Sequence, residues 1–557
     1  MKKYWWQDAI IYQIYLRSFK DSNGDGIGDI PGVIEKLDYL KRLSVNTLWI
    51  SPHYDSPMDD NGYDIRDFFK VAEDYGTMED FKRLIEVAHA NDMKIVTDLV
   101  LNHTSDEHPW FQAAKDPSHP DHARYHDYYI WHPGHVQEDG SKKRPTRWIS
   151  WFGGSVWDYN EATEEYYLHI FSKKMPDLNW RNDAMRNELK AMIQWWIDLG
   201  IDGFRIDASN HLEKNWDFPD DEPGYQHFSS LPKHHDYLQE LADELFMPNN
   251  LLILGEAGGA SKEEALQYAG FDSNEFNMLI HFGHVWVDID DSNTLTPGKW
   301  AKGTVKLSKI KEALSHWIDV FHEKGWNTLY WHNHDHPRVV SHYGNDDPLY
   351  HERSAKMLAA LLYLLPGTPI VYQGEEIGMT NVDYQSLHDF KDVEVFTEYE
   401  NFMRHGASHE IAMQALRDRA RDNARAPMQW SSSDGAGFTA GTPWMPVVKN
   451  HTRINVAAQE KDPNSILAWY RMLLALRKED AIAYSYPTFY HLDKDDRFAY
   501  AFSASHHDYY VVGNFTQEPL EFIPDVSLEA MDLWAANTDV SPGELGPYET
   551  RIYRTKK

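Results

Sequence analysis

The feature that most constrains the fold is a repeated order in which a short apolar run precedes a segment with helical spacing of apolar residues. This order is typical of parallel β-strands joined by helices, because each parallel pair needs a crossover connection and the helix covers the sheet. The predicted strands lie at residues 10–15, 46–50, 94–101, 203–206, 251–254, 277–282, 327–331 and 368–372, and the predicted helices at residues 34–43, 78–90, 184–199, 235–245 and 355–365. Eight strands in this order predict an α/β protein built on a (β/α)8 TIM barrel.

Two parts of the chain depart from this order. Residues 104–174 are rich in His, Asp, Pro and Trp and show no strand–helix alternation, which indicates a subdomain inserted after the third strand. From residue 481 the chain changes to alternating segments of β-branched and aromatic residues, which are typical of an antiparallel sheet. The predicted domains are therefore a catalytic barrel of residues 1–103 and 175–480, an insert of residues 104–174 and a C-terminal antiparallel β-domain of residues 481–557.

Charge and composition exclude several classes of function. The 557 residues include 54 Lys and Arg but 87 Asp and Glu, a formal net charge of −33 that disfavours nucleic acid and anionic membranes as partners. The absence of cysteine excludes disulfides, thiolate metal sites and a cysteine nucleophile. The N-terminal segment has Gln7 and Asp8 where a signal peptide needs an unbroken apolar run. We expect a cytoplasmic protein that is a monomer or a homodimer.

Charged and polar side chains follow several of the predicted strands. In a barrel of this kind, the carboxyl ends of the strands form the active site. Any one of these residues is more often a helix cap or a structural histidine than a catalytic group. Their joint occurrence indicates a site, because burying several like charges is costly unless they are paired or used. The residues are Asp98, Asn102, His103, Arg205, Asp207, Glu256, His334 and Asp335.

Glycosyl transfer is the chemistry that suits paired carboxylates at one barrel mouth. One ionised carboxylate attacks the anomeric carbon of a sugar, and a second, protonated carboxyl gives its proton to the leaving oxygen. Arg205 is two residues from Asp207, so both side chains lie on one face of the strand and the arginine favours the ionised aspartate. Glu256 follows an apolar strand, where burial favours the neutral acid.

Six stretches closely resemble motifs of the α-amylase family of glycoside hydrolases, and in particular its oligo-1,6-glucosidase and α-glucosidase branch. They are DLVLNH at residues 98–103, GFRID at 203–207, GE at 255–256, NHD at 333–335, QGEEIGM at 373–379 and RDNARAPMQW at 421–430. The resemblance implies a retaining, exo-acting α-glucosidase that releases or transfers glucosyl units of a small oligosaccharide through a covalent intermediate. It implies that Asp207 is the nucleophile, Glu256 the general acid/base and Asp335 the carboxylate that stabilises the transition state.

The resemblance also implies the residues that bind the sugar. His103, Arg205 and His334 resemble the ring that holds the glucosyl unit, and Asp60 and Arg421 the pair that closes the pocket beyond its non-reducing end. A closed pocket implies that glucose is removed one unit at a time. Aromatic walls are expected from Tyr63, Phe152 and Phe171.

A metal loop is predicted near the N-terminus. Oxygen-bearing residues alternate with glycine, as in a calcium-binding turn, and the carbonyl of Ile27 falls where a backbone ligand is needed. The loop is not a complete EF-hand, because Gly32 occupies the position of the final glutamate, and the pattern alone fits a solvated turn equally well. The resemblance implies a structural calcium ion, with magnesium as the alternative, and no organic cofactor. The expected ligands are Asp21, Asn23, Asp25, Ile27 and Asp29.

The residue after the expected nucleophile bears on the linkage that is cleaved. Members of the branch that prefer α-1,6 bonds resemble one another in having valine there, whereas this chain has Ala208. The segment MPDLN at residues 175–179 also departs from the form typical of oligo-1,6-glucosidases. Both features favour α-1,4-linked malto-oligosaccharides, with isomalto-oligosaccharides as the main alternative. Water or a second sugar can resolve the intermediate, so transglucosylation stays open.

Other functions remain as alternatives. A sucrose or trehalose isomerase shares the motifs, but no Arg-rich isomerase loop is visible, and a phosphorylated-disaccharide hydrolase needs a cationic clamp that is not apparent in the sequence. An inactive, transporter-associated relative would lack the carboxylates that this chain retains. His332 and His336 flank the NHD motif, and our hypothesis is that both shape the acceptor side of the pocket.

Overall fold

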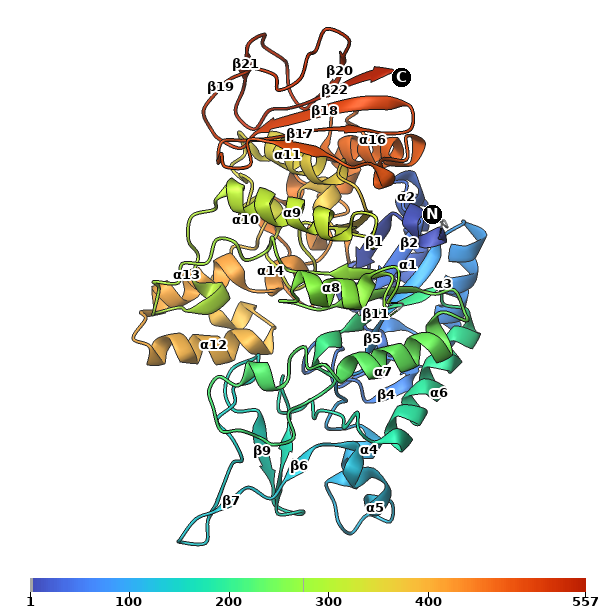
Figure 1. Cartoon of the computed structure of the whole chain (residues 1–557), viewed down its shortest axis with the longest axis vertical. Coiled ribbons are helices and arrows are strands. Elements are labelled where there is room, and N and C mark those ends of the chain that lie inside the picture. Colours follow the sequence, from blue (N-terminus) through green and yellow to red (C-terminus); the bar gives the residue numbers. More distant parts are fainter. Residues whose placement is uncertain (1–3, 274, 557) are drawn as a thin grey trace.

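The computed structural model describes residues 4–273 and 275–556, and its central element is a ring of parallel strands. In these residues eight parallel strands lie in the order β13-β12-β11-β5-β2-β1-β15-β14, and a parallel bridge from Leu279 to Asn327 closes the ring (Figure 1). The strands are β1 (Ile11–Ile14), β2 (Thr47–Ile50), β5 (Lys94–Val100), β11 (Gly203–Asp207), β12 (Leu252–Glu256), β13 (Met278–Ile280), β14 (Thr328–Leu329) and β15 (Thr368–Tyr372). The predicted (β/α)8 barrel is confirmed.

Helices surround the barrel because each carries one apolar face toward the strands. They are α1 (Ile30–Glu35), α2 (Leu37–Arg42), α3 (Met78–Ala90), α6 (Asp183–Leu199), α7 (His234–Leu241), α8 (Lys262–Ala269), α9 (Leu307–Phe321), α10 (Val339–His342), α11 (His351–Tyr363), α15 (Val456–Gln459) and α16 (Ile466–Glu479).

The prediction of one helix over residues 34–43 is wrong. Asp29 caps an earlier start by accepting a hydrogen bond from Gly32 N at 2.7 Å, and Pro31 suits the first turn. The chain then breaks between α1 and α2 at Lys36, whose N–H bonds to the carbonyl of Val33, only three residues back. This tighter turn interrupts the α-helical ladder.

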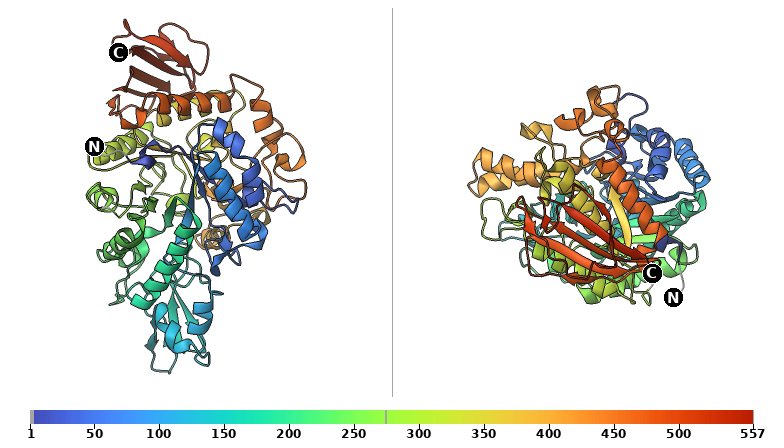
Figure 2. Two further views of the ribbon diagram at one scale, coloured as in Figure 1. Left: turned by 90° about the vertical axis from the view of Figure 1, so that its right-hand side faces the viewer. Right: turned by 90° about the horizontal axis from the view of Figure 1, so that it is seen from above.

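The segment between β5 and α6 forms a separate layer below the barrel (Figures 1 and 2). It has its own apolar core, which includes Trp148, Trp157 and Ile170. Its ordered elements are α4 (Pro109–Ala114), α5 (His122–Tyr125), β6 (Trp131–His132), β7 (His135–Val136), β8 (Lys142–Lys143), β9 (Trp157–Asn160) and β10 (Glu165–Leu168), with β6-β10-β9 forming an antiparallel sheet. A second segment outside the barrel follows β2 and forms a two-stranded antiparallel sheet of β3 (Tyr54–Asp55) and β4 (Asp67–Val71).

A further group of helices leaves the barrel between β15 and α16, and the sequence had assigned these residues to the barrel without distinguishing them. They are α12 (Val393–Arg404), α13 (His409–Arg419) and α14 (Asp422–Arg425). In Figure 1, α12 and α13 project to one side of the barrel, and α14 lies closer to its centre. They matter for function because they carry Arg421 and Arg425 to the site described below.

The C-terminal part is an antiparallel sheet in the order β16-β17-β18-β22-β20, at the end of the molecule opposite the insert (Figure 2). It packs on the barrel partly through Tyr500, whose hydroxyl donates to carbonyls of α11. Its strands are β16 (Thr488–Tyr490), β17 (Arg497–Ser503), β18 (His507–Asn514), β20 (Asp532–Ala536) and β22 (Thr550–Lys556), with β19 (Leu520–Glu521) and β21 (Glu544–Leu545) paired beside them. Within the residues described, no helix has the length and apolar character needed to cross a membrane.

Candidate active site

A single buried arginine gathers three of the predicted carboxylates. Nη1 of Arg205 lies 2.5 Å from Oδ1 of Asp98 and 2.8 Å from Oδ1 of Asp207, while Nη2 contacts Oε2 of Glu256. The barrel register explains this meeting, because Arg205 on β11 pairs with Asp98 on β5, and β12 on the other side ends at Glu256. The sequence had paired Arg205 with Asp207 alone, whereas the structure brings three carboxyl groups to one guanidinium.

Asp98 differs from the other carboxylates because it is sealed from solvent. Trp49 donates its indole N–H to Asp98 at 2.9 Å, and burial raises the pKa of Asp98 to about 6 although Arg205 opposes the shift. The side chains of Asp207 and Glu256 are 15% and 16% exposed, and that of Asp335 is 23% exposed. Asp98 therefore orients Arg205 from below, and the three predicted catalytic carboxylates are the ones that a substrate can reach.

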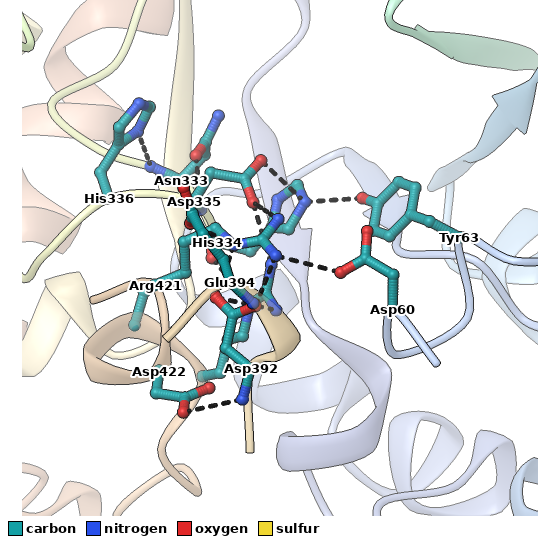
Figure 3. Close-up of polar contacts among 12 residues, drawn as sticks. Asp60, Tyr63, Asn333, His334, Asp335, His336, Asp392, Glu394, Arg421 and Asp422 are labelled. Carbon is teal, nitrogen blue, oxygen red and sulfur yellow. Dashed lines mark hydrogen bonds and ion pairs between the residues drawn. The ribbon is translucent and has the colours of Figure 1, made fainter. Parts of the chain in front are cut away.

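Asp335 lies just beyond β14 among positive groups (Figure 3). Arg425 contacts its Oδ1 at 2.9 Å and Arg421 at 3.4 Å. Burial alone would raise the pKa of Asp335, but His334, Arg421 and Arg425 outweigh it and hold that pKa well below its usual range. These contacts favour the ionised form of Asp335.

His334 forms the floor beside Asp335 and is fixed on both ring nitrogens. Gln13 donates its amide N–H to Nδ1 at 2.8 Å, which leaves Nε2 as the donor to the hydroxyl of Tyr63 at 2.7 Å. The ring of Tyr63 stacks on His334 with a centroid distance of 5.4 Å. Burial lowers the pKa of His334 well below its ordinary value, although the neighbouring Asp335 opposes the shift. Gln13 was missed in the sequence because it lies inside an apolar strand.

The predicted pair that closes the pocket is present. Nη2 of Arg421 contacts Oδ1 of Asp60 at 3.0 Å, and burial raises the pKa of Asp60 to about 7 while Arg421 partly offsets the shift. Arg421 is also held by Asp392 through two contacts of 2.6 Å, as Figure 3 shows. Asp392 is fully buried and was not predicted, because it lies 29 residues before Arg421 with no local pattern that joins them.

The predicted aromatic walls line up between these groups. Phe152 lies against the guanidinium of Arg421 at 4.9 Å and against Phe171 at 5.5 Å. Phe171 meets the ring of His103 edge-on at 5.4 Å, and Nε2 of His103 bonds to the carbonyl of Tyr63 at 3.2 Å. The structure therefore brings His103, Tyr63, Phe152 and Phe171 into one continuous wall.

Ala208 makes a sharp turn directly after Asp207. Its φ of 46° and ψ of 39° lie in the left-handed region, and its side chain is buried. This conformation costs a non-glycine residue roughly 1–2 kcal/mol, and more for a β-branched one. The turn directly follows Asp207 at the end of β11.

The two histidines that flank the NHD motif have different surroundings. Nδ1 of His332 lies 3.3 Å from Glu375, and both of its ring nitrogens are sealed from solvent. The hypothesis that His332 shapes the acceptor side stays a prediction, and such an effect would act through neighbouring residues because the His332 side chain is buried. His336 meets the rings of Phe282 and Trp286 at 5.2 and 5.3 Å, and both rings are partly exposed. For His336 the hypothesis stays a prediction.

The predicted metal loop is stabilised by its own backbone. Asp21 accepts N–H bonds from Asn23, Gly24 and Gly26, and Asp29 accepts from Ser22 and Gly32. Asp21 and Asp29 are buried, burial raises the pKa of Asp29, and neither forms an ion pair with a basic side chain of residues 4–273 or 275–556.

Among residues 4–273 and 275–556, no group of three His, Asp or Glu side chains lies close enough together to hold a metal ion. The possible ligands in the loop are all oxygen atoms, which suit a hard cation. They include Asn23, the carbonyl of Ile27 and the two buried carboxylates of Asp21 and Asp29, which have no cationic partner among the described residues.

The profile of the alpha-amylase catalytic domain matches residues 13–485. The chain belongs to the α-amylase family. It is 44% identical to the oligo-1,6-glucosidase of Halalkalibacterium halodurans over the full length of both chains, and 41% identical to the trehalose-6-phosphate hydrolase of Bacillus subtilis over 99% of this chain and 98% of that one. This α-amylase family fold superposes with a TM-score of 0.92 on isomaltulose synthase of Erwinia rhapontici in complex with sucrose, at 37% identity and covering 100% of this chain and 99% of the other. The protein is thus a glycoside hydrolase.

Proposed function

We propose that the protein is a retaining, exo-acting α-glucosidase that cleaves α-1,6 bonds at the non-reducing ends of short isomalto-oligosaccharides. The observation that supports the proposal is the meeting of Asp207 and Glu256 at Arg205, with Asp335 joined to Asp60 through Arg421. The choice of linkage is supported by the relative named oligo-1,6-glucosidase, which is 44% identical along the whole chain. It replaces the α-1,4 preference expected from the sequence.

Each carboxylate has a distinct part in the proposed reaction. Asp207, held 2.8 Å from Arg205, attacks C1 of the glucosyl unit and forms a covalent bond as the bond to the leaving oxygen breaks. Glu256 gives its proton to that oxygen, then takes a proton from the water that attacks C1 and releases Asp207. Asp335 remains ionised and accepts hydrogen bonds from hydroxyls of the distorted sugar ring.

Hydrolysis of α-1,4 bonds is the second candidate, and Ala208 is the observation that favours it. Its methyl group leaves more room beside the leaving sugar than the valine of α-1,6-specific members would. A difference of one or two methyl groups is worth about 1–3 kcal/mol, so it changes a ratio of rates rather than excluding a substrate. In either case a sugar in place of water would give transglucosylation.

We also propose that the loop of residues 21–29 binds calcium, or magnesium in its absence. Asp21, Asn23, Asp25, Asp29 and the Ile27 carbonyl would hold the ion, and its charge would offset the buried carboxylates of Asp21 and Asp29. The ion's role is structural.

A comparison of substrates tests the proposed function. The purified protein is incubated separately with isomaltotriose, maltotriose, sucrose and trehalose, and products are separated over time, while proton NMR records the anomer of the first glucose released. We expect isomaltotriose to be consumed fastest, with α-glucose as the first product. Faster loss of maltotriose would show that the protein prefers α-1,4 bonds to α-1,6 bonds. β-Glucose as the first product would refute the retaining mechanism.

A further inference from the structure

Arg338 is a buried arginine without a carboxylate in contact. Its side chain is fully enclosed, and among the described residues it forms no ion pair with an Asp or a Glu, so burial lowers the pKa of its guanidinium. The guanidinium donates instead to three main-chain carbonyls: Nη1 to Gln373 at 2.5 Å, Nη2 to Ala424 at 2.8 Å and Nε to Asn423 at 3.3 Å. Because a buried charge without a counter-charge is costly, this arrangement needs a reason beyond packing.

Helix α14 is the segment that Arg338 holds, and it is too short to hold itself. A helix of four residues leaves its own carbonyls without partners inside the helix, so these carbonyls need donors from outside. Arg338 supplies two such donors, at Asn423 and Ala424, and the hydroxyl of Tyr372 supplies another to Ala424 at 2.9 Å. The position of α14 therefore depends on side chains that lie outside the helix.

The residues at the two ends of α14 are the partners of Asp335. Arg421 precedes the helix and contacts Oδ1 of Asp335 at 3.4 Å, and Arg425 ends the helix and contacts the same atom at 2.9 Å. Arg338 follows Asp335 by three residues, so it links the loop that carries this carboxylate to the helix that carries both cationic partners. The backbone N–H of Arg338 donates to Oδ1 of Asn381 at 2.8 Å, which fixes the loop from a further side.

Arginine suits this set of contacts and lysine does not. A guanidinium is planar and presents its donors in fixed directions, whereas an ammonium is a compact charge on a flexible stem. The guanidinium of Arg338 also lies over the ring of Tyr372, with its Cζ 5.1 Å from the ring centroid. Arg338→Lys would therefore keep the charge but reach fewer of the three carbonyls.

We propose that Arg338 is a positioning residue for Asp335, because it holds α14 where Arg421 and Arg425 meet that carboxylate. Arg338 is fully buried and does not touch the substrate, so it acts through these two arginines. A displacement of α14 by about 1 Å would weaken both charge contacts and change the direction of the carboxylate. This inference rests on the proposed glucosidase function and adds to it a residue that the reaction needs.

Arg477 provides a matched control at the other end of β15. It is also buried, forms no ion pair within the described part of the chain, and donates to the carbonyls of Tyr363, Leu365 and Gly367 at 2.5–2.6 Å. These carbonyls precede β15, whereas that of Gln373 follows it. Arg477 therefore makes the same kind of contact away from the barrel end that carries the site.

The test measures kcat and KM on 4-nitrophenyl α-glucoside, together with the melting temperature, for Arg338→Lys and Arg477→Lys. Both variants lose hydrogen bonds to buried carbonyls, so both should melt at a lower temperature than the unaltered protein. Only Arg338→Lys should lose kcat, by about 10- to 100-fold with a smaller change in KM, because Asp335 acts on the distorted ring of the transition state. If Arg338→Lys does not fold, Arg338→Gln takes its place. Similar kcat values in the Arg338 and Arg477 variants would overturn the inference.

A double-variant cycle shows whether Arg338 acts through Arg425. The loss of kcat caused by Arg338→Lys should be at least about threefold smaller in an Arg425→Met background, because the contact that it misplaces is already absent. Arg477→Lys should have the same small effect in both backgrounds. Independent losses from Arg338→Lys and Arg425→Met would overturn the inference. Absence of hydrolysis by the unaltered protein would instead contradict the proposed function.

Discussion

The position of Asp207 beside Arg205 leads to the first prediction. Asp207→Asn keeps the shape of the side chain but removes the nucleophile, because an amide does not form the glucosyl ester. We expect kcat on 4-nitrophenyl α-glucoside to fall by several orders of magnitude. The melting temperature should change little, since Asp98 and Glu256 still pair with Arg205. The matched control is Asp198→Asn, at an exposed position of α6. Near-normal turnover in Asp207→Asn would show that another group attacks C1.

The residues that the sequence could place are those that barrel geometry brings together by itself. Asp207, Glu256 and Asp335 all follow predicted strands, so parallel alignment was enough to predict that they meet. Gln13 could not be found, because a buried amide inside an apolar strand leaves no pattern. Arg425 carried a usable signal that was missed: it is four residues after Arg421, and helical spacing places both guanidinium groups on one face toward Asp335.

Lys214 holds together the two segments that flank the insert, Asn102 just before it and Asp177 just after it, and this contact gives a prediction about stability. Its Nζ contacts Oδ2 of Asp177 at 2.7 Å and Oδ1 of Asn102 at 2.7 Å, with Lys214 and Asp177 wholly buried. Lys214→Met fills the same space but leaves Asp177 charged and unpaired, which typically costs about 3–5 kcal/mol. We expect a melting temperature lower by several degrees and faster proteolysis within residues 104–174.

The control for this change is Lys324→Met, at an exposed position outside the insert. It removes the same charge without disturbing a buried pair, so its melting temperature and proteolysis should match those of the unaltered protein. If the two variants behave alike, the buried pair does not hold the insert in place.

Helices and strands were predicted well where a single periodic pattern of apolar residues determines them. They were predicted less well where short-range hydrogen bonds determine their ends. The barrel strands are short runs of two to seven mostly apolar residues, which the sequence shows directly. The break between α1 and α2 at Lys36 involves an N–H bond from Lys36 to the carbonyl of Val33, and no residue type in this segment predicts it. Helices α12 to α14 look like barrel helices in sequence, because the periodicity of an amphipathic helix does not record what the helix packs against.

The loop of residues 21–29 contacts a segment more than 400 residues later, so its proposed ion bears on the whole molecule. The carbonyl of Phe438 accepts the backbone N–H of Asp21, and the hydroxyl of Thr439 donates to the Asp21 carboxylate. The backbone N–H of Trp444 donates to the carbonyl of Gly26 at 3.0 Å. These contacts join the turn after β1 to the segment that precedes α16 and the C-terminal sheet. An ion in the loop would therefore stabilise contacts between the two ends of the barrel chain.

Chelation tests this stabilisation. A ligand that binds only the folded state at 100 times its Kd adds about 2.7 kcal/mol, so EDTA should lower the melting temperature by several degrees and added calcium should restore it. Asp21→Asn weakens the proposed site, and its melting temperature should respond little to EDTA. The control is Asp139→Asn, an exposed aspartate that likewise accepts N–H bonds within a turn, which should keep the full response. An EDTA-insensitive melting temperature together with no calcium in the purified protein would mean that hydrogen bonds alone hold the loop.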